Sequence, residues 1–243
     1  MPIKGDFLRI KKLKQRFGKG KNISLRELYS FYNSSAKATI HWRIYKLIAM
    51  GILKRVGRGI YQLEAGTLYY PEIPKTAKAI YNKVKQNFLY ANVCVWHTSC
   101  LNEFTVHQAG KHNILIEVEK DVAESVFNFL NDHYKEVFLS PSKEVYHRYI
   151  VGKKEGIVVL PLVSEAPTQL MDDINTVTLE KILVDIFCDN VLFAPFQGNE
   201  MRNIFLTAME KYIVNISTLN RYAYRRGKKE ELEQYISKLD LRQ

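Results

Sequence analysis

Cysteine is scarce in this sequence, and its spacing excludes several classes of protein. The chain of 243 residues has three cysteines, Cys94, Cys100 and Cys188, and no C-x-x-C pair. An odd number without paired spacing argues against a disulfide framework and against a zinc ribbon. We therefore expect buried, reduced thiols and a cytoplasmic protein.

Long apolar runs are absent as well. No stretch approaches the roughly 20 apolar residues that a membrane span needs. The basic N-terminus has no continuous apolar core, so we do not expect a secretory signal or a membrane protein. There is also no glycine-rich phosphate loop. With 47% hydrophobic and 25% charged residues, the composition is that of an ordinary globular protein.

Acidic residues are rare in the N-terminal quarter. Residues 1–65 contain 15 Lys and Arg against 3 Asp and Glu, a net charge of +12, whereas the whole chain carries +11. The rest of the chain is therefore close to neutral. A concentrated basic excess indicates a phosphate backbone as partner. A membrane surface would instead need an exposed apolar helix face, and here that face is required for a core.

Residues 34–63 predict a helix followed by a basic hairpin. Ser34 and Ser35 are N-cap types, and an apolar stripe at helical spacing follows them until Gly51. Two short strands then flank the turn at residues 57–59. This order is typical of a recognition helix and its wing.

The residues upstream complete a winged helix-turn-helix. Apolar spacing predicts a first helix at about residues 4–17, and Ser24 with Glu27 forms a capping box for a second helix. We predict a DNA-binding domain at residues 1–66. The face opposite the apolar stripe has cations, small or hydroxyl side chains and aromatics, but no acid. The predicted DNA-contacting residues are Ser34, Ser35, Lys37, Thr39, His41, Trp42, Lys46, Lys54, Arg55 and Arg58. Alternatively, Trp42 and Tyr45 pack against another domain and the charges form a solvated face.

The remainder of the chain predicts an α+β architecture. Residues 67–75 contain two prolines and no periodicity, which indicates a linker. Residues 76–243 alternate strands with helices and end in a run of helices. We therefore predict a winged helix-turn-helix followed by a mixed α/β domain with a helical C-terminal end.

Catalytic candidates in the second domain are weak. Glu117 and Glu119 alternate on a predicted strand and could share a metal ion, but a restriction-type nuclease needs a lysine two residues after the second acid. Lys120 is one position off, so solvated acids on a strand edge are the simpler interpretation. His97 and Ser99 lack an evident third group, which favours a hydrogen-bonded core histidine. We predict no catalytic residue, no cofactor and no metal site.

One ion pair follows from helical spacing. Asp185 lies four residues after Lys181 on an otherwise apolar helix, so these two side chains can pair.

The chain resembles the AbiEi family of abortive-infection antitoxins. The winged helix ends in GRGIYQL, and WHTSCLNEF, ILIEVEKD, VVLPLVSEAP, TVTLEKILVDIF and STLNRYAYRRGKKEELEQYI follow in order. Many bacterial regulators end a wing with GRGIY, whereas the ordered set is more specific. The resemblance spans both predicted domains.

This resemblance implies a function in a type IV toxin–antitoxin operon that takes part in phage defence. The DNA-binding half would repress its own promoter at inverted repeats, and the C-terminal half would counter a nucleotidyltransferase-like toxin without a stable complex. Possible contacts with the toxin or a nucleic acid are Arg221, Arg225, Arg226, Lys228 and Lys229. A solvated helix end is the alternative for this cluster. The competing function is a metal-dependent nuclease targeted by the winged helix. The sequence leaves the operator, the oligomeric state and the toxin open.

Overall fold

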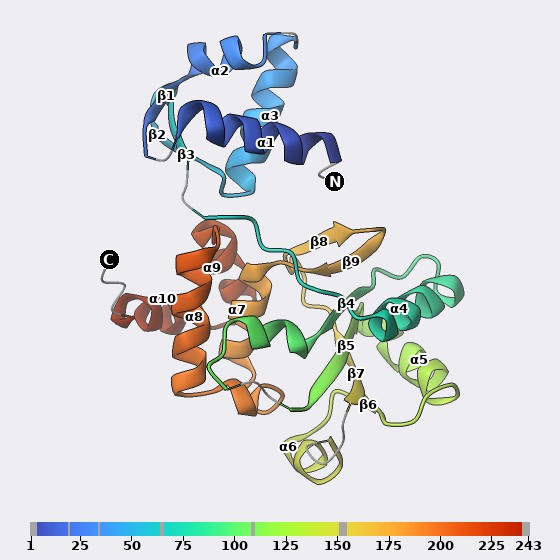
Figure 1. The fold of residues 1–243 in the computed structure, drawn as a ribbon. Coiled ribbons are helices and arrows are strands. Elements are labelled where there is room, and N and C mark those ends of the chain that lie inside the picture. Colours follow the sequence, from blue (N-terminus) through green and yellow to red (C-terminus); the bar gives the residue numbers. More distant parts are fainter. Residues whose placement is uncertain are drawn as a thin grey trace. The chain divides into compact units, whose positions relative to one another are not determined.

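The computed structural model describes residues 4–18, 20–33, 35–63, 66–107, 110–150 and 155–239. The fold is α+β, as predicted. The chain divides into two compact units (Figure 1). The first unit contains Met1–Leu68 together with Met209–Asn215, and the second contains Tyr69–Ala208 and Ile216–Gln243.

The first unit is a winged helix-turn-helix. In chain order its elements are α1 (Lys4–Phe17), β1 (Asn22–Ser24), α2 (Leu25–Phe31), α3 (Lys37–Ala49), β2 (Leu53–Gly57) and β3 (Ile60–Leu63). The strands form an antiparallel sheet in the order β1-β3-β2. β1 was not anticipated, because three residues are too few to show a period in the sequence.

Local sequence signals set the boundaries of these helices. The capping box forms as predicted, since Glu27 N bonds Ser24 Oγ and the Glu27 carboxylate accepts the Ser24 N–H. Gly51 follows α3 with φ +68°, a conformation that glycine adopts without steric cost. Ser24 and Gly51 thus bracket the helix-turn-helix.

The core of the first unit includes a residue from far along the chain. Ile40, Ile44 and Leu47 of α3 are buried, as their spacing predicted, and they pack in one cluster with Leu13 and Ile213. Asn215 Nδ2 also donates to the Ala49 carbonyl at 2.7 Å. The first unit is therefore closed by a segment some 150 residues beyond the wing.

The predicted linker at residues 67–75 is largely packed. Thr67 exchanges backbone hydrogen bonds with Lys211 and Ile213, at 3.3 and 2.9 Å. Tyr69 is buried in the second unit, where its hydroxyl reaches the Cys100 carbonyl. The prediction was incomplete because contacts with distant residues leave no periodic signal.

The second unit is built on a mixed four-stranded sheet in the order β4-β5-β7-β6. Its strands are β4 (Cys94–His97), β5 (His112–Val118), β6 (Val137–Leu139) and β7 (Glu155–Pro161). β4 is antiparallel to β5, whereas β5, β7 and β6 run parallel. Residues 157–159 of β7 are apolar and buried, and because successive side chains alternate, they cover both faces of the sheet.

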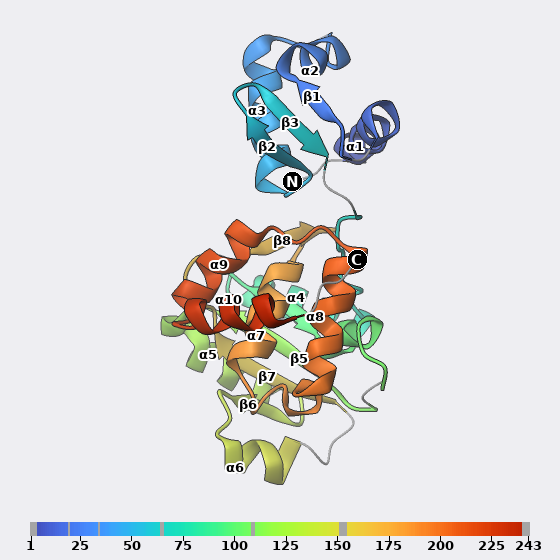
Figure 2. The same ribbon diagram turned by 90° about the vertical axis from the view of Figure 1, so that its left-hand side faces the viewer.

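Helices cover both faces of this sheet (Figures 1 and 2). α4 (Lys75–Asn87) and α5 (Lys120–Asn131) pack on one face in a cluster with Val95, Ile116 and Val159. α7 (Leu179–Cys188) packs on the opposite face together with α9 (Ile216–Arg225). Because side chains alternate along a strand, Glu117 of β5 points to the α7 face.

Shorter elements and the remaining helices complete the second unit. They are η1 (Thr98–Glu103), α6 (Lys143–Val145), η2 (Tyr146–Ile150), β8 (Thr168–Met171), β9 (Ile174–Val177), η3 (Ala194–Phe196), α8 (Asn199–Lys211) and α10 (Lys229–Lys238). The β8–β9 hairpin was not anticipated. Among the helices of the described residues, none is long and apolar enough to cross a membrane.

Candidate nucleic-acid interface

The exposed face of α3 presents cationic, hydroxyl and aromatic side chains. Lys37 and Thr39 are exposed, and Trp42 and Tyr45 keep 55% and 71% of their surface accessible. The Lys46 ammonium lies 3.8 Å from the centroid of the Trp42 ring. These two aromatics are thus accessible beside the cations, whereas the opposite face of α3 is buried.

Two of the predicted DNA-contacting residues are engaged within the unit. His41 Nε2 lies 2.6 Å from the Tyr29 hydroxyl, and Ser35 Oγ accepts from Arg43 Nη1 at 2.7 Å. Ser35 is not the cap of α3, because Ala36 occupies the N-cap position and gives no side-chain hydrogen bond. His41 therefore joins α3 to α2, whereas Ser35 bonds α3 to the turn before it. Ser34 lies outside the described residues.

The wing adds exposed cations around a bulge. Lys54, Arg55 and Arg58 are exposed, and Arg55 Nε donates to the Gly57 carbonyl at 3.3 Å. The ladder between β2 and β3 shifts register between Arg55 and Gly57, which leaves Val56 as the extra residue. A bulge strengthens the local twist of a hairpin.

Two apolar residues lie beside these cations. Val56 and Ile60 are 43% and 38% exposed. Their exposure does not follow from the sequence, because exposure of an apolar strand residue depends on which side of the hairpin is covered. Tyr45 was likewise absent from the predicted contact residues.

The C-terminal cations are paired with acids. Arg225 lies 2.7 Å and Arg221 3.9 Å from the Glu165 carboxylate, and Arg226 bonds Asp185 at 2.5 Å. Lys228 pairs with Glu231 at 2.9 Å and Lys229 with Glu233 at 4.0 Å. All five predicted contact residues thus have a carboxylate partner, which argues against a free cationic patch. Four of them are substantially exposed, as at a solvated helix end, whereas Arg226 pairs with the buried Asp185.

A buried ionic cluster lies between β5, α7 and α9. Lys181 is 0% exposed, and its ammonium donates to both Glu117 oxygens at 2.8 Å and to Asp185 at 2.5 Å. The predicted pairing of Lys181 with Asp185 is confirmed. Asp185 also accepts from the Tyr222 hydroxyl at 2.9 Å and from Arg226. Two carboxylates and two cations balance the charge of this cluster.

The electrostatics of the cluster keep its lysine charged. Burial by itself lowers the pKa of Lys181, but the carboxylates of Asp185 and Glu117 more than offset this and raise the pKa well above its usual value. Burial raises the pKa of Glu117, and Lys181 opposes that shift. A carboxylate without this lysine would be protonated more easily.

The two strand glutamates are held by separate partners. Glu117 is 4% exposed and also accepts the Trp96 Nε1–H at 2.9 Å. Glu119 is exposed and accepts the Asn92 N–H at 2.8 and 2.9 Å. A lysine does lie beside Glu117, but it comes from α7 and not from the strand. The interpretation of Glu117 as a solvated edge acid is wrong, because spacing along one strand gives no information about the helix that covers it.

His97 is a hydrogen-bonded core residue, as predicted. Its Nδ1 lies 2.5 Å from Ser99 Oγ, and its Nε2 lies 3.1 Å from Glu155 Oε1. Glu155 is thus the third group that the sequence did not reveal, 58 positions away. His97 Nδ1 also accepts the Ser99 N–H, so the ring caps η1.

Burial raises the pKa of Cys100 to about 12, which leaves its thiol protonated near neutral pH.

Comparison with known proteins assigns a family. Residues 39–242 match DUF6577, a family of unknown function. The match covers most of the chain, so the protein belongs to this family. No curated protein matches the chain.

Proposed function

We propose that this member of the DUF6577 family is a cytoplasmic DNA-binding autorepressor and the antitoxin of a type IV toxin–antitoxin operon, without enzymatic activity. The observation that carries the DNA-binding part is the exposed surface of α3 and the wing. Lys37, Trp42 and Arg58 are accessible there, and α3, β2 and β3 contain no acidic residue. Basic residues beside exposed aromatics fit a phosphate backbone and base edges.

The proposed complex places α3 in the major groove of double-stranded DNA. Thr39 and Trp42 would contact base edges, whereas Lys37 and Lys46 would contact phosphates. The wing would contact the backbone or the minor groove through Lys54, Arg55 and Arg58. The operator would be the protein's own promoter, with inverted repeats that reflect a two-fold arrangement of protein.

Lys37→Ala and Arg58→Ala are expected to weaken operator binding by roughly tenfold each, since each removes a charged contact. The slope of log K against log salt concentration should become shallower by about one unit for each phosphate contact removed. Fluorescence anisotropy of a labelled promoter fragment at several salt concentrations measures both quantities. Lys78→Ala is the matched control, because Lys78 is a partly exposed lysine of the second unit that pairs with Asp172. Unchanged affinity in both test variants would remove α3 and the wing from the DNA interface.

The antitoxin part of the proposal comes from the resemblance to AbiEi, which spans both units. The partner would be a nucleotidyltransferase-like toxin encoded in the same operon, countered without a stable complex. This system would act in abortive infection, as a defence against phage.

Co-expression with the adjacent open reading frame tests the antitoxin part. We expect the neighbouring gene alone to stop growth and this protein to restore it. A Lys37→Ala, Arg58→Ala double variant expressed from an independent promoter should still protect, because protection is assigned to the second unit. A harmless neighbour would exclude the antitoxin function and leave the DNA-binding proposal standing.

The nuclease alternative depends on Glu117, and its environment is unfavourable. Both oxygens of this carboxylate accept hydrogen bonds from Lys181, and the residue is 4% exposed. A metal ligand at this position would have to break these bonds. Cleavage of DNA by the purified protein with Mg²⁺, lost in Glu117→Gln, would replace the non-enzymatic proposal with this alternative.

A further inference from the structure

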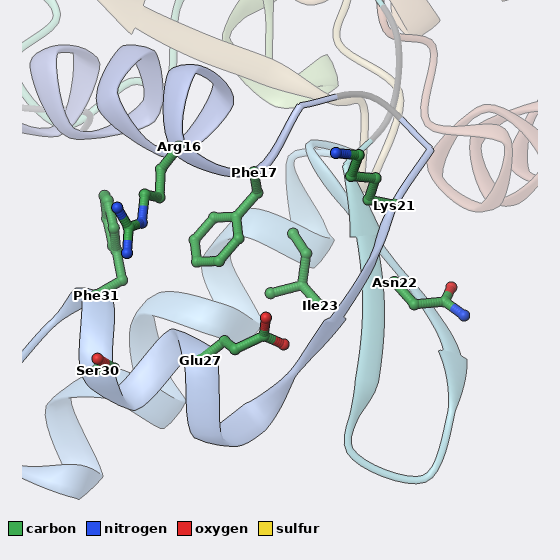
Figure 3. Close-up of a pocket in the computed structure, with 8 residues that line it drawn as sticks. All are labelled: Arg16, Phe17, Lys21, Asn22, Ile23, Glu27, Ser30 and Phe31. Atoms are coloured by element: carbon green, nitrogen blue, oxygen red, sulfur yellow. The ribbon is translucent and has the colours of Figure 1, made fainter.

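The first unit contains a groove that the proposed function does not use. It lies between α1 and α2, beside β1, and has a volume of about 490 Å³ (Figure 3). Sites for small molecules typically measure roughly 300–1,000 Å³. The groove is therefore large enough for a ligand of that class.

The floor of the groove is apolar and aromatic. Ile23 is fully buried beneath it, and Phe17 and Phe31 line it from α1 and α2. The two rings are tilted by 58°, with centroids 5.8 Å apart. Both rings are only half-buried, so part of each is left for contact with a ligand. Such surfaces favour a flat, weakly polar ring.

Two cations lie at the groove, one on each side of Phe17 (Figure 3). Arg16 comes from the last turn of α1 and Lys21 from the segment before β1 (Figure 3). Both are exposed, and in the described part of the chain neither forms an ion pair with a carboxylate. The C-terminal cations, by contrast, are all paired. Arginine forms two parallel hydrogen bonds with a phosphate group, and lysine adds a point charge.

A fixed carboxylate lies at the α2 side. Glu27 Oε2 accepts from both the N–H and the hydroxyl of Ser24, each at 2.7 Å. These bonds lower the pKa of Glu27, so the carboxylate stays ionised at neutral pH. They do not involve Oε1, which remains able to accept from an N–H donor. Figure 3 shows the Glu27 side chain reaching into the space between the helices.

We propose that this groove binds a nucleoside monophosphate. The phosphate would bind Arg16, the base would lie on Phe17 and Phe31, and an exocyclic amine would donate to Glu27. The arrangement matches this class because it combines an anion site, a flat apolar surface and an acceptor for N–H groups in one groove.

A chain of contacts leads from the groove to the recognition helix. The Phe31 ring lies 4.8 Å from the Tyr32 ring, and the Arg43 guanidinium lies over Tyr32 at 5.3 Å. Arg43 in turn donates to Ser35 before α3. A nucleotide that orders Phe31 is therefore expected to change the affinity of α3 for DNA, and this consequence rests on the proposed function.

Isothermal titration of the full-length protein with AMP tests the site without DNA. Arg16→Gln should weaken AMP binding by roughly tenfold, the effect of losing a charge-assisted contact with phosphate. Lys12→Gln is the matched control, since Lys12 is an exposed cation of α1 that does not line the groove. Inorganic phosphate and adenosine should each bind at least tenfold more weakly than AMP. The proposal would be overturned if AMP does not bind, if Lys12→Gln weakens AMP binding as much as Arg16→Gln does, or if inorganic phosphate binds as tightly as AMP.

A second titration separates this proposal from the proposed function. Anisotropy of the labelled promoter fragment is measured with and without saturating AMP. If AMP binds but the protein has no affinity for DNA, the groove stands and the repressor proposal fails. If DNA binds and AMP does not, the groove proposal fails alone. If both bind with no mutual effect, the link from Phe31 to α3 is refuted.

Discussion

Replacing Lys181 by methionine is expected to destabilise the second unit by about 3–5 kcal/mol. Lys181 is fully buried and donates to Glu117 and Asp185. Methionine has a similar length but no charge, so the variant leaves two buried carboxylates with one fewer counterion. Removal of one partner from a buried ion pair costs far more than loss of an exposed pair, because the desolvated charge remains. Chemical denaturation followed by circular dichroism measures the change.

The effect of this substitution should depend on pH, with a definite sign. In Lys181→Met, burial raises the pKa of Glu117 without the opposing lysine. A carboxyl group whose pKa is higher in the folded than in the unfolded protein binds more protons when folded. The folded variant therefore loses stability as pH rises through that pKa. We expect the difference from the wild-type protein to be smaller at pH 5 than at pH 8.

Arg225→Gln provides the control for Lys181→Met. Arg225 pairs with Glu165 at 2.7 Å, but both side chains are substantially exposed, at 39% and 49%. Solvent screens such pairs, so the expected loss of stability is at most about 1 kcal/mol. Equal losses in the two variants, or a loss in Lys181→Met that grows as pH falls, would contradict the role assigned to the buried cluster.

Truncation of Ile213 to alanine is expected to destabilise the first unit by about 2–4 kcal/mol. Ile213 is 7% exposed and belongs to the same core cluster as Ile44 and Leu47 of α3. Its Cγ2 lies only 2.9 Å from the position of a β-carbon added to Gly51, which shows how closely this segment meets the end of α3. Loss of the branched side chain leaves a cavity beneath α3.

Hydrogen exchange measured by mass spectrometry locates the effect of Ile213→Ala. Exchange should accelerate in α3 and the wing, and binding to the promoter fragment should weaken in parallel. Ile216→Ala is the matched control, because Ile216 is 48% exposed and lies three positions further along. Faster exchange in β5 without a change in α3 would show that Ile213 does not support the first unit.

This core also changes how the proposed DNA-binding domain is delimited. Its sequence signals end near the wing, and a fragment of residues 1–66 would contain α1 to β3. That fragment lacks Ile213 and Asn215, which close the core and bond α3. Experiments on DNA binding therefore require the full chain.

The sequence by itself determined the features that depend on neighbouring residues. Ser24 and Glu27 stand three positions apart, so their capping box and the start of α2 follow from spacing alone. The apolar period of α3, its end at Gly51 and the concentration of positive charge in residues 1–65 are equally local. The pair of Lys181 with Asp185 was predictable for the same reason, since one helical turn separates them.

Only the tertiary structure decided which distant residues meet. Glu117 of β5 pairs with Lys181 of α7, 64 positions away. Ile213 packs in a core whose other buried members precede residue 64. In the folded chain the predicted C-terminal cations pair with acids such as Glu165, whereas Arg16 and Lys21 line a groove. Periodicity reports which face of an element is apolar, but packing between elements decides which charges are buried, paired or open to a ligand.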